Sequence, residues 1–508
     1  MDKILDKYEM TIGIECHVQL KTKTKLFSGS DNDARGKEPN EATSPIDFGL
    51  PGMLPVLNHE AVRLAVRAGK ALNSSIANVS RFDRKHYFYP DLPKGYQTSQ
   101  LYQPIIGAGK IAVPLSDGTE TEIGIEHAHL EEDAGKLTHF GDYSLVDLNR
   151  AGTPLIEIVS MPDIHSAEAA RAYAEELHRR MIYADVTEGD LYQGNMRFDV
   201  NISARKHGEK ELGTRTEVKN LNSFRSVERA ALYEFERQVK LLEKGEKIKQ
   251  ETRGWIDDEQ KTVSQRSKEE AQDYRYMPDP DIPPIILTNE RISELQRNFP
   301  KMPGEYRKLW QKLDLDKSVI ETILQNKLVA ELLNATFGEG YSQTKEEIVN
   351  TTVAMLEFEN YSMSQHDKNI KKIFNWFASI PAEDLDISKV ESGYVGPTRL
   401  TALAQMVSEN KLSSNGGKEV FLALFDENVG MKMPEEIAKE KNLLQVSDEG
   451  AIAKIVDEVL ADASSAKAVA DIKSGNDKAI GFLVGQIMKR SQGKANPALA
   501  QKLIRERL

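Results

Sequence analysis

Glu15 and His17 form the first pair whose types and spacing could do chemistry, because they stand two positions apart in a stretch of alternating polar and apolar residues. Such alternation predicts a strand on which both side chains leave one face, while the opposite face is apolar. A carboxylate beside an imidazole suits metal binding or proton transfer. A solvated sheet face has the same pattern, so this pair alone leaves both interpretations open.

A lone carboxylate, Glu157, interrupts the apolar run of residues 155–159. Burying a carboxylate is costly unless it is paired, hydrogen-bonded or bound to a cation. An ordinary ion pair with an arginine would meet that need. The interpretation that we favour is a functional role for Glu157, as a metal ligand or a catalytic group.

Residues 126–139 gather histidines and carboxylates in a short segment. Strand geometry would place four of these groups on one face: His127, His129, Glu131 and Asp133. Glu132 would then point to the other face, but Gly135 indicates a turn, so periodicity does not decide which carboxylates converge. Clustered carboxylates repel one another unless a cation lies among them, although a polar surface hairpin is equally compatible. Oxygen ligands with one imidazole favour Mg²⁺ or Mn²⁺ and do not exclude Zn²⁺.

Two further alternating stretches carry cationic side chains. Arg197 and Asp199 line one face of the first stretch, and Arg215 and Lys219 line one face of the second. Side by side, two such strands would form a polar floor that suits the recognition of phosphate groups. A salt-bridged, exposed sheet face is the ordinary alternative.

The elements that must position these groups are strands in the first part of the chain and helices in the rest. Alternation predicts strands near residues 12–20, 155–160, 196–204 and 214–219, and apolar stripes predict helices that follow the N-cap residues Ser166 and Ser223. Four prolines within residues 277–284 exclude a helix or a central strand there. The predicted fold class is therefore α+β. We expect three domains: a catalytic domain (1–295), a helical domain (296–395) and a helical tail domain (396–508).

The tail shows the clearest helical pattern in the sequence. Asn496 followed by Pro497 is typical of a helix start, and the preceding apolar residues repeat with helical spacing. This end is also basic. The cations that we select as candidate contacts to a nucleic acid are Lys489, Arg490 and Lys494.

Composition narrows the class of protein further. The chain has 508 residues, a net charge of −12 and a single cysteine, Cys16. An acidic chain is not a general nucleic-acid-coating protein and can meet a nucleic acid only through a local basic patch. One cysteine excludes an internal disulfide and fits a reducing compartment. We expect neither a secretory signal nor a membrane span.

Several familiar motifs are missing from the sequence. It contains no phosphate-binding G-x-x-x-x-G-K-[ST] loop, no G-x-G-x-x-G and no G-x-S-x-G elbow, so any nucleotide site is of another kind. It also lacks a glycine- and serine-rich amidase signature. If this protein takes part in a reaction that uses ammonia from an amide donor, another chain must release that ammonia.

Long strings in this sequence resemble the B subunits of the bacterial aspartyl/glutamyl-tRNA(Asn/Gln) amidotransferases, the GatB/GatE family, across nearly the whole length. They include IGIECHVQLKTKTKLFSG from Ile12, SLVDLNRAGTPLIEIVS from Ser144, GTRTEVKNLNSFR from Gly213, DYRYMPDPD from Asp273 and GFLVGQIMKRSQGKANP from Gly481. The resemblance implies a cradle-like catalytic domain around an antiparallel sheet, followed by helical domains and a tail that contacts tRNA.

The resemblance also implies a reaction. ATP would activate the side-chain carboxylate of Glu-tRNA(Gln) or Asp-tRNA(Asn), and ammonia from a partner amidase would convert it to the amide. The expected partners are an amidase subunit and a small third subunit, which complete a heterotrimer, and misacylated tRNA, with no DNA and no membrane. The expected location is cytoplasmic. The alternative from another class is a tRNA-binding scaffold without catalysis.

Site residues follow from the resemblance position by position. It implies a divalent ion, Mg²⁺ first, held by four residues that would also be catalytic: Glu15, His17, Glu132 and Glu157. Glu132 is chosen over Glu131 by resemblance alone. We assign nucleotide binding to the polar floor, namely to Arg197, Asp199, Arg215 and Lys219. The chain departs from the family pattern at Met161, Tyr192 and Gln193, where the family usually has acidic residues.

Overall fold

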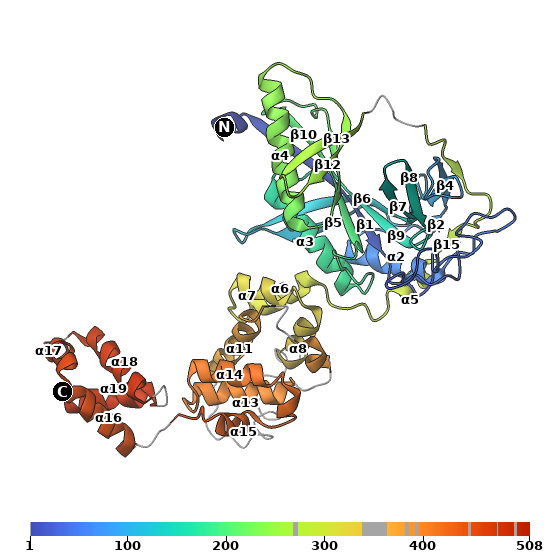
Figure 1. Ribbon diagram of the computed structural model, residues 1–508. Coiled ribbons are helices and arrows are strands. Elements are labelled where there is room, and N and C mark those ends of the chain that lie inside the picture. Colours follow the sequence, from blue (N-terminus) through green and yellow to red (C-terminus); the bar gives the residue numbers. More distant parts are fainter. Residues whose placement is uncertain are drawn as a thin grey trace. The chain divides into compact units, whose positions relative to one another are not determined.

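The computed structural model describes residues 2–508 except 268–272, 338–362, 382–385, 392–394, 446–448, 475 and 492–494 (Figure 1). The chain forms two compact units, Met1–Gly304 and Glu305–Leu508. The first unit runs past the expected boundary at residue 295, because the Phe299 ring lies under Arg67 and Lys70 of the helix α2 (His59–Ala71). The division into three domains stays a prediction.

The first unit is built on an eight-stranded sheet of order β13-β12-β11-β10-β1-β9-β6-β5. Its neighbours pair antiparallel except β11 and β12, which are parallel. The strands are β1 Tyr8–Gln19, β5 Gly109–Pro114, β6 Glu120–Glu132, β9 Pro154–Ser160, β10 Met196–Lys206, β11 Thr216–Leu221, β12 Glu251–Ile256 and β13 Lys261–Ser267. The strands that carry the candidate residues therefore lie side by side at the centre of the sheet.

Two long helices cover the apolar face of this sheet. They are α3 (Ala167–Tyr183) and α4 (Phe224–Glu243), which pack on each other and on the strands (Figure 1). Their N-caps are Ser166 and Ser223, as predicted, and each serine side chain accepts a backbone N–H of the first turn. The apolar set of β1 is buried beneath them, as the alternation predicts: Ile12, Ile14, Cys16 and Val18.

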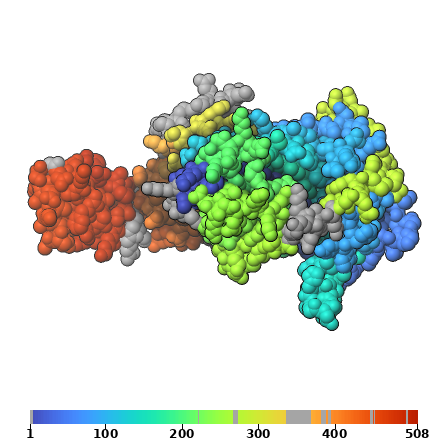
Figure 2. All heavy atoms as spheres, turned by 90° about the horizontal axis from the view of Figure 1, so that it is seen from above, coloured from blue at the N-terminus to red at the C-terminus, as the bar shows by residue number. Residues whose placement is uncertain are grey.

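Smaller elements surround the sheet. The short sheet β14-β3-β4 consists of Met277–Pro278, Asp83–His86 and Tyr96–Ser99, and β15 (Ile285–Ile286) pairs with β2 (Val79–Ser80). The proline-rich segment thus forms only two-residue strands. The hairpin β7 (Lys136–Phe140) and β8 (Tyr143–Asp147) pairs only with itself and stands out from the surface in turquoise (Figure 2). The short helices are α1 (Asp2–Leu5) and α5 (Asn289–Leu295).

The elements of the second unit that the structure describes are helices, apart from an isolated β-bridge between Leu412 and Leu444. Its α-helices are α6 Pro303–Gln311, α7 Lys317–Ile323, α8 Lys327–Phe337, α11 Met363–Ala378, α12 Ile387–Glu391, α13 Pro397–Ser408, α14 Ser414–Ala423, α15 Pro434–Glu440, α16 Glu449–Ala461, α17 Ala466–Lys473, α18 Ile480–Arg490 and α19 Pro497–Arg507. The expected start of α19 is confirmed, since the Asn496 side chain accepts two backbone N–H groups and Pro497 follows. An α+β class with a largely helical C-terminal region is thereby confirmed. No described helix combines the length and apolar character needed to cross a membrane.

Candidate functional site

The register of the central strands aligns the candidate residues in a row across one face of the sheet. On one side of β1, Glu15 lies opposite Asp199 of β10. On the other side, His17 lies opposite Glu157 of β9, and Glu157 lies opposite His129 of β6. Cross-strand partners share a face, so the lone carboxylate and the Glu15–His17 pair meet there, opposite the face that α3 and α4 cover.

Two carboxylates and two imidazoles form the first cluster in this row. His17 Nε2 lies 3.3 Å from Glu157 Oε2 and 3.4 Å from Glu131 Oε1. His129 Nε2 approaches the same two carboxylates at 3.7 and 3.8 Å. One ligand atom each from His17, Glu131 and Glu157 lies within 4.8 Å of the others. An imidazole between a buried carboxylate, Glu131, and a half-buried one, Glu157, is a donor set that fits a divalent cation.

The pKa shifts in the first cluster show that positive charge stabilises its carboxylates. Burial works to lower the pKa of His17, but the hydrogen bond to Glu157 and the charge of Glu131 raise it to about 9. Burial works to raise the pKa of Glu157, but the hydrogen bond from His17 and the charge of His129 bring it well below its ordinary value. The protonated His17 imidazole thus offsets the negative charge of Glu131 and Glu157, as a bound cation also would.

A second cluster lies beside the first and contains Glu15, Asp199 and Glu217, whose ligand atoms also lie within 4.8 Å of one another. Lys219 Nζ contacts Asp199 Oδ2 at 2.9 Å and Glu217 Oε1 at 2.7 Å, and Asn201 donates to Glu15 Oε1 at 2.8 Å. Burial and the neighbouring carboxylates raise the pKa of Glu15 above its ordinary value. Of the expected polar floor, the structure thus brings together Asp199 and Lys219, with their charges paired.

Glu132 meets surroundings quite different from those of Glu131. Strand alternation directs its side chain away from the first cluster, where it forms an ion pair with Lys94 and accepts the backbone N–H of Thr98 at 2.9 Å. Of the four ligands that the resemblance implies, the structure brings together His17 and Glu157. It places Glu15 in the second cluster and leaves Glu132 outside both.

The remaining cations of the polar floor differ in their surroundings. Arg197 donates to Asp133 Oδ2 at 3.0 Å, and Arg150 also contacts this oxygen, at 3.4 Å. Arg215 is exposed and stands one position before β11 begins. Lys219 belongs to the second cluster, so the structure brings it together with Asp199 but not with Arg197 or Arg215.

Sequence reasoning missed one candidate functional residue, Lys85, which lies on β3 of the three-stranded sheet β14-β3-β4. Its partner across β3 and β4 is Gln97, whose side-chain amide donates to the Glu132 carbonyl at 2.9 Å. This bond fixes the small sheet against the end of β6, next to Glu131. No local pattern in the sequence links these distant segments, so only the folded structure reveals the proximity.

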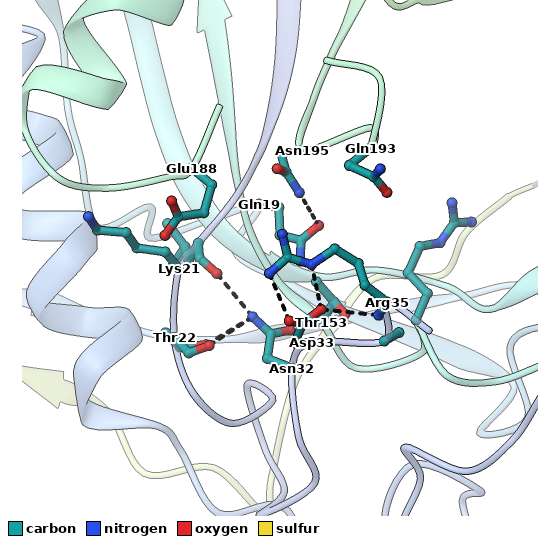
Figure 3. A pocket seen from close by; sticks show the side chains of 13 residues that line it. Gln19, Lys21, Thr22, Asn32, Asp33, Arg35, Thr153, Glu188, Gln193 and Asn195 are labelled. Carbon is teal, nitrogen blue, oxygen red and sulfur yellow. Dashed lines mark hydrogen bonds and ion pairs between the residues drawn. The ribbon is translucent and has the colours of Figure 1, made fainter. Parts of the chain in front are cut away.

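A polar cavity of about 320 Å³ opens where β1 ends and β9 and β10 begin (Figure 3). Gln19 lies on its wall and accepts a hydrogen bond from Asn195 at 3.1 Å, and Asn32 donates to the Leu20 carbonyl at 3.0 Å. Gln193, one of the departures from the family pattern, also lines it. Arg150, which contacts Asp133, connects this cavity with the polar face.

The candidate tRNA contacts lie at the end of α18. Lys489 and Arg490 occupy its last turn, and Arg490 forms an ion pair with Asp462. No ion pair of Lys489 occurs among the residues that the structure describes. Lys494 lies outside the described residues.

Comparisons with known proteins identify the family of the chain. The family model described as "GatB/GatE catalytic domain" matches residues 10–293, and the model described as "GatB domain" matches residues 357–508. The fold and the site thus define a GatB-type protein, with a sheet-rich catalytic domain followed by a helical region.

Similar proteins share one name, which describes each of them as the B subunit of an aspartyl/glutamyl-tRNA(Asn/Gln) amidotransferase. The protein from Persephonella marina is 44% identical over 508 residues, covering 99% of this chain and 100% of its own length. Those from Bdellovibrio bacteriovorus and Alcanivorax borkumensis are 42% and 44% identical, each covering 99% of both chains. The chain belongs to the family of aspartyl/glutamyl-tRNA(Asn/Gln) amidotransferase B subunits.

Proposed function

We propose that this chain is the amidotransferase subunit that uses ATP to activate the side-chain carboxylate of Glu-tRNA(Gln) or Asp-tRNA(Asn), so that ammonia converts it to the amide. The observation that carries this proposal is the cluster of the half-buried His17 and Glu157 with the buried Glu131 in the catalytic domain. A concentration of largely buried acidic and imidazole groups on one sheet face is typical of a reactive site.

The chemistry requires two steps. The terminal phosphoryl group of ATP passes to a carboxylate oxygen: the bond from phosphorus to the ADP oxygen breaks, and a bond from phosphorus to the carboxylate forms. Ammonia then attacks the carbonyl carbon. Phosphate leaves with the electron pair of the carbon–oxygen bond, and the nitrogen releases one proton. Such transfers depend on positioning and on compensation of negative charge.

A divalent cation, with Mg²⁺ preferred and Mn²⁺ or Zn²⁺ as alternatives, would be held by His17, Glu131 and Glu157 and would supply positive charge at the phosphoryl group. The fit is supported by the approach of their ligand atoms within 4.8 Å of one another. Lys219 and Asp199 lie on the same face and would position the nucleotide, with Arg197 and Arg215 as further contacts.

The proposed partners are an amidase chain, a small third chain and misacylated tRNA. The relatives' name describes them as one of several subunits, which supports a complex with other chains. The missing amidase signature supports the delivery of ammonia from one of them. The tRNA contacts that we propose are Lys489, Arg490 and Lys494 on the tail.

Glu157→Ala tests the proposal in the assembled complex. We expect ATP-dependent amide formation on misacylated tRNA to fall on the order of 100-fold or more, because a charge-compensating group is removed from the reaction centre. Glutamine hydrolysis by the partner should persist. The matched control is Glu122→Ala, which removes an exposed carboxylate from β6. Full amide formation by the Glu157→Ala complex would remove this cluster from the mechanism, and a wild-type complex without tRNA-stimulated ATP turnover would indicate a scaffold instead.

A further inference from the structure

Lys85 lies on the strand β3, outside the eight-stranded sheet, in a small sheet that is bonded to the end of β6. Its cross-strand partner Gln97 shares its face, and Gln97 is bonded to the Glu132 carbonyl, one peptide unit from Glu131. The side chain of Lys85 therefore leaves the small sheet on the side where β6 ends. It approaches the candidate reaction centre from a different element than the strands β1, β6 and β9, which build that centre.

Aromatic rings hold the ammonium group in place. Lys85 Nζ lies 4.9 Å from the ring centroid of Tyr274 and 6.0 Å from that of Tyr87, and these two rings meet edge to face. Cation–π attraction keeps the charged group near the rings but uses none of its N–H donors. A half-buried ammonium held in this way retains its capacity to bind an incoming anion.

The other lysines near the site have their charges paired. Lys94 forms an ion pair with Glu132, and Lys219 contacts two carboxylates of the second cluster. Within the described part of the chain, Lys85 Nζ forms neither a hydrogen bond nor an ion pair. Lys85 thus differs from its neighbours in offering donors that the described residues do not use.

The charge on Lys85 is stable at neutral pH. Burial works to lower its pKa, but Tyr276 and the carboxylates of Glu131 and Glu157 raise it above its ordinary value. Lys85 in turn contributes to the low pKa of Glu157. The charges of Lys85 and of the first cluster therefore stabilise each other, and no ion pair joins them within the described residues.

We propose that Lys85 is a further catalytic residue, whose ammonium group binds the anionic oxygens of the aminoacyl carboxylate and of the phosphoryl group transferred to it. This inference rests on the proposed function. Lys85 remains protonated in both steps. It offsets the negative charge that gathers as the bond from phosphorus to ADP breaks and the bond to the carboxylate forms, and it then accompanies the phosphate that ammonia displaces.

The test compares Lys85→Met, Lys85→Arg and the surface control Lys110→Met in the assembled complex, with misacylated tRNA, ATP and glutamine. Lys110 is exposed and lies on the edge strand β5, opposite Gly124 of β6. We expect Lys85→Met to lower kcat for amide formation on the order of 100-fold, with KM for tRNA, glutamine hydrolysis and thermal unfolding close to wild type. Lys85→Arg keeps the charge and should retain more activity than Lys85→Met. If Lys85→Met does not assemble, Lys85→Gln replaces it with the same expectation.

Three outcomes would overturn the inference. Wild-type kcat in Lys85→Met would remove Lys85 from the mechanism and leave the proposed function standing. Loss of thermal stability with unchanged kcat would make Lys85 a structural residue of the aromatic cluster. A wild-type complex that forms no amide with ATP would end the proposed function, and the role of Lys85 with it.

Discussion

Glu131 and Glu132, two adjacent glutamates at the end of β6, point in opposite directions and have different partners. Glu131 faces the imidazoles of His17 and His129, whereas Glu132 is held by Lys94 and a backbone N–H. Around Glu131, a metal cation could replace the protons on the imidazoles. Glu132 already has its charge compensated by the ammonium group of Lys94. At the scale of the residue, the structure therefore supports Glu131 rather than Glu132 as the metal ligand.

Replacing each glutamate by glutamine separates these two possibilities. We expect Glu131→Gln to weaken Mn²⁺ binding by at least about 10-fold, because a charged ligand is lost. Glu132→Gln should leave Mn²⁺ binding near wild type but lower the free energy of unfolding by about 3 kcal/mol, because the half-buried Lys94 loses its carboxylate. Calorimetric titration and denaturant unfolding measure the two effects. If Mn²⁺ binding weakened in Glu132→Gln and stayed at the wild-type level in Glu131→Gln, the metal ligand would be Glu132.

At the scale of elements, local periodicity predicts much of the fold but not the contacts between distant segments. The alternation of β1 and β10 and the capped starts of α3, α4 and α19 are confirmed. The strand interpretation of residues 126–139 also places Glu131 with His129, while the resemblance favours Glu132. Lys85 could not be found in this way, because its place depends on a bond between β4 and β6.

The proposed tRNA contacts of the tail are better tested by single substitutions than by deleting its helices. Residues of α16, α18 and α19 share one apolar core, so removing the chain beyond Ser474 would expose that core. We instead expect Lys489→Ala to weaken tRNA binding and to lower the salt slope of log K by about 1, the value for one lost phosphate contact. The matched control is Lys502→Ala, whose lysine lies near Glu506. Equal slopes for wild type and Lys489→Ala, measured by filter binding over a salt series, would leave Lys489 without a tRNA contact.

At the scale of the whole molecule, the proposed reaction and the proposed tRNA binding are assigned to different units. The candidate reaction centre lies within Met1–Gly304, and the candidate tRNA contacts lie within Glu305–Leu508. A chain with a net charge of −12 is not drawn to RNA as a whole, so its affinity must come from local cations. Binding and chemistry should consequently respond to separate substitutions: Lys489→Ala changes binding, and Glu157→Ala changes the reaction.

The fate of the carboxylate oxygen tests carboxylate activation most directly. Misacylated tRNA whose side-chain carboxylate carries oxygen-18 is incubated with the assembled complex, ATP and glutamine, and the released phosphate is analysed by mass spectrometry. Because the carboxylate oxygen leaves with the phosphoryl group, we expect each amide formed to yield one phosphate that carries oxygen-18. Amide formation with phosphate free of oxygen-18 would contradict the activation of the carboxylate by ATP.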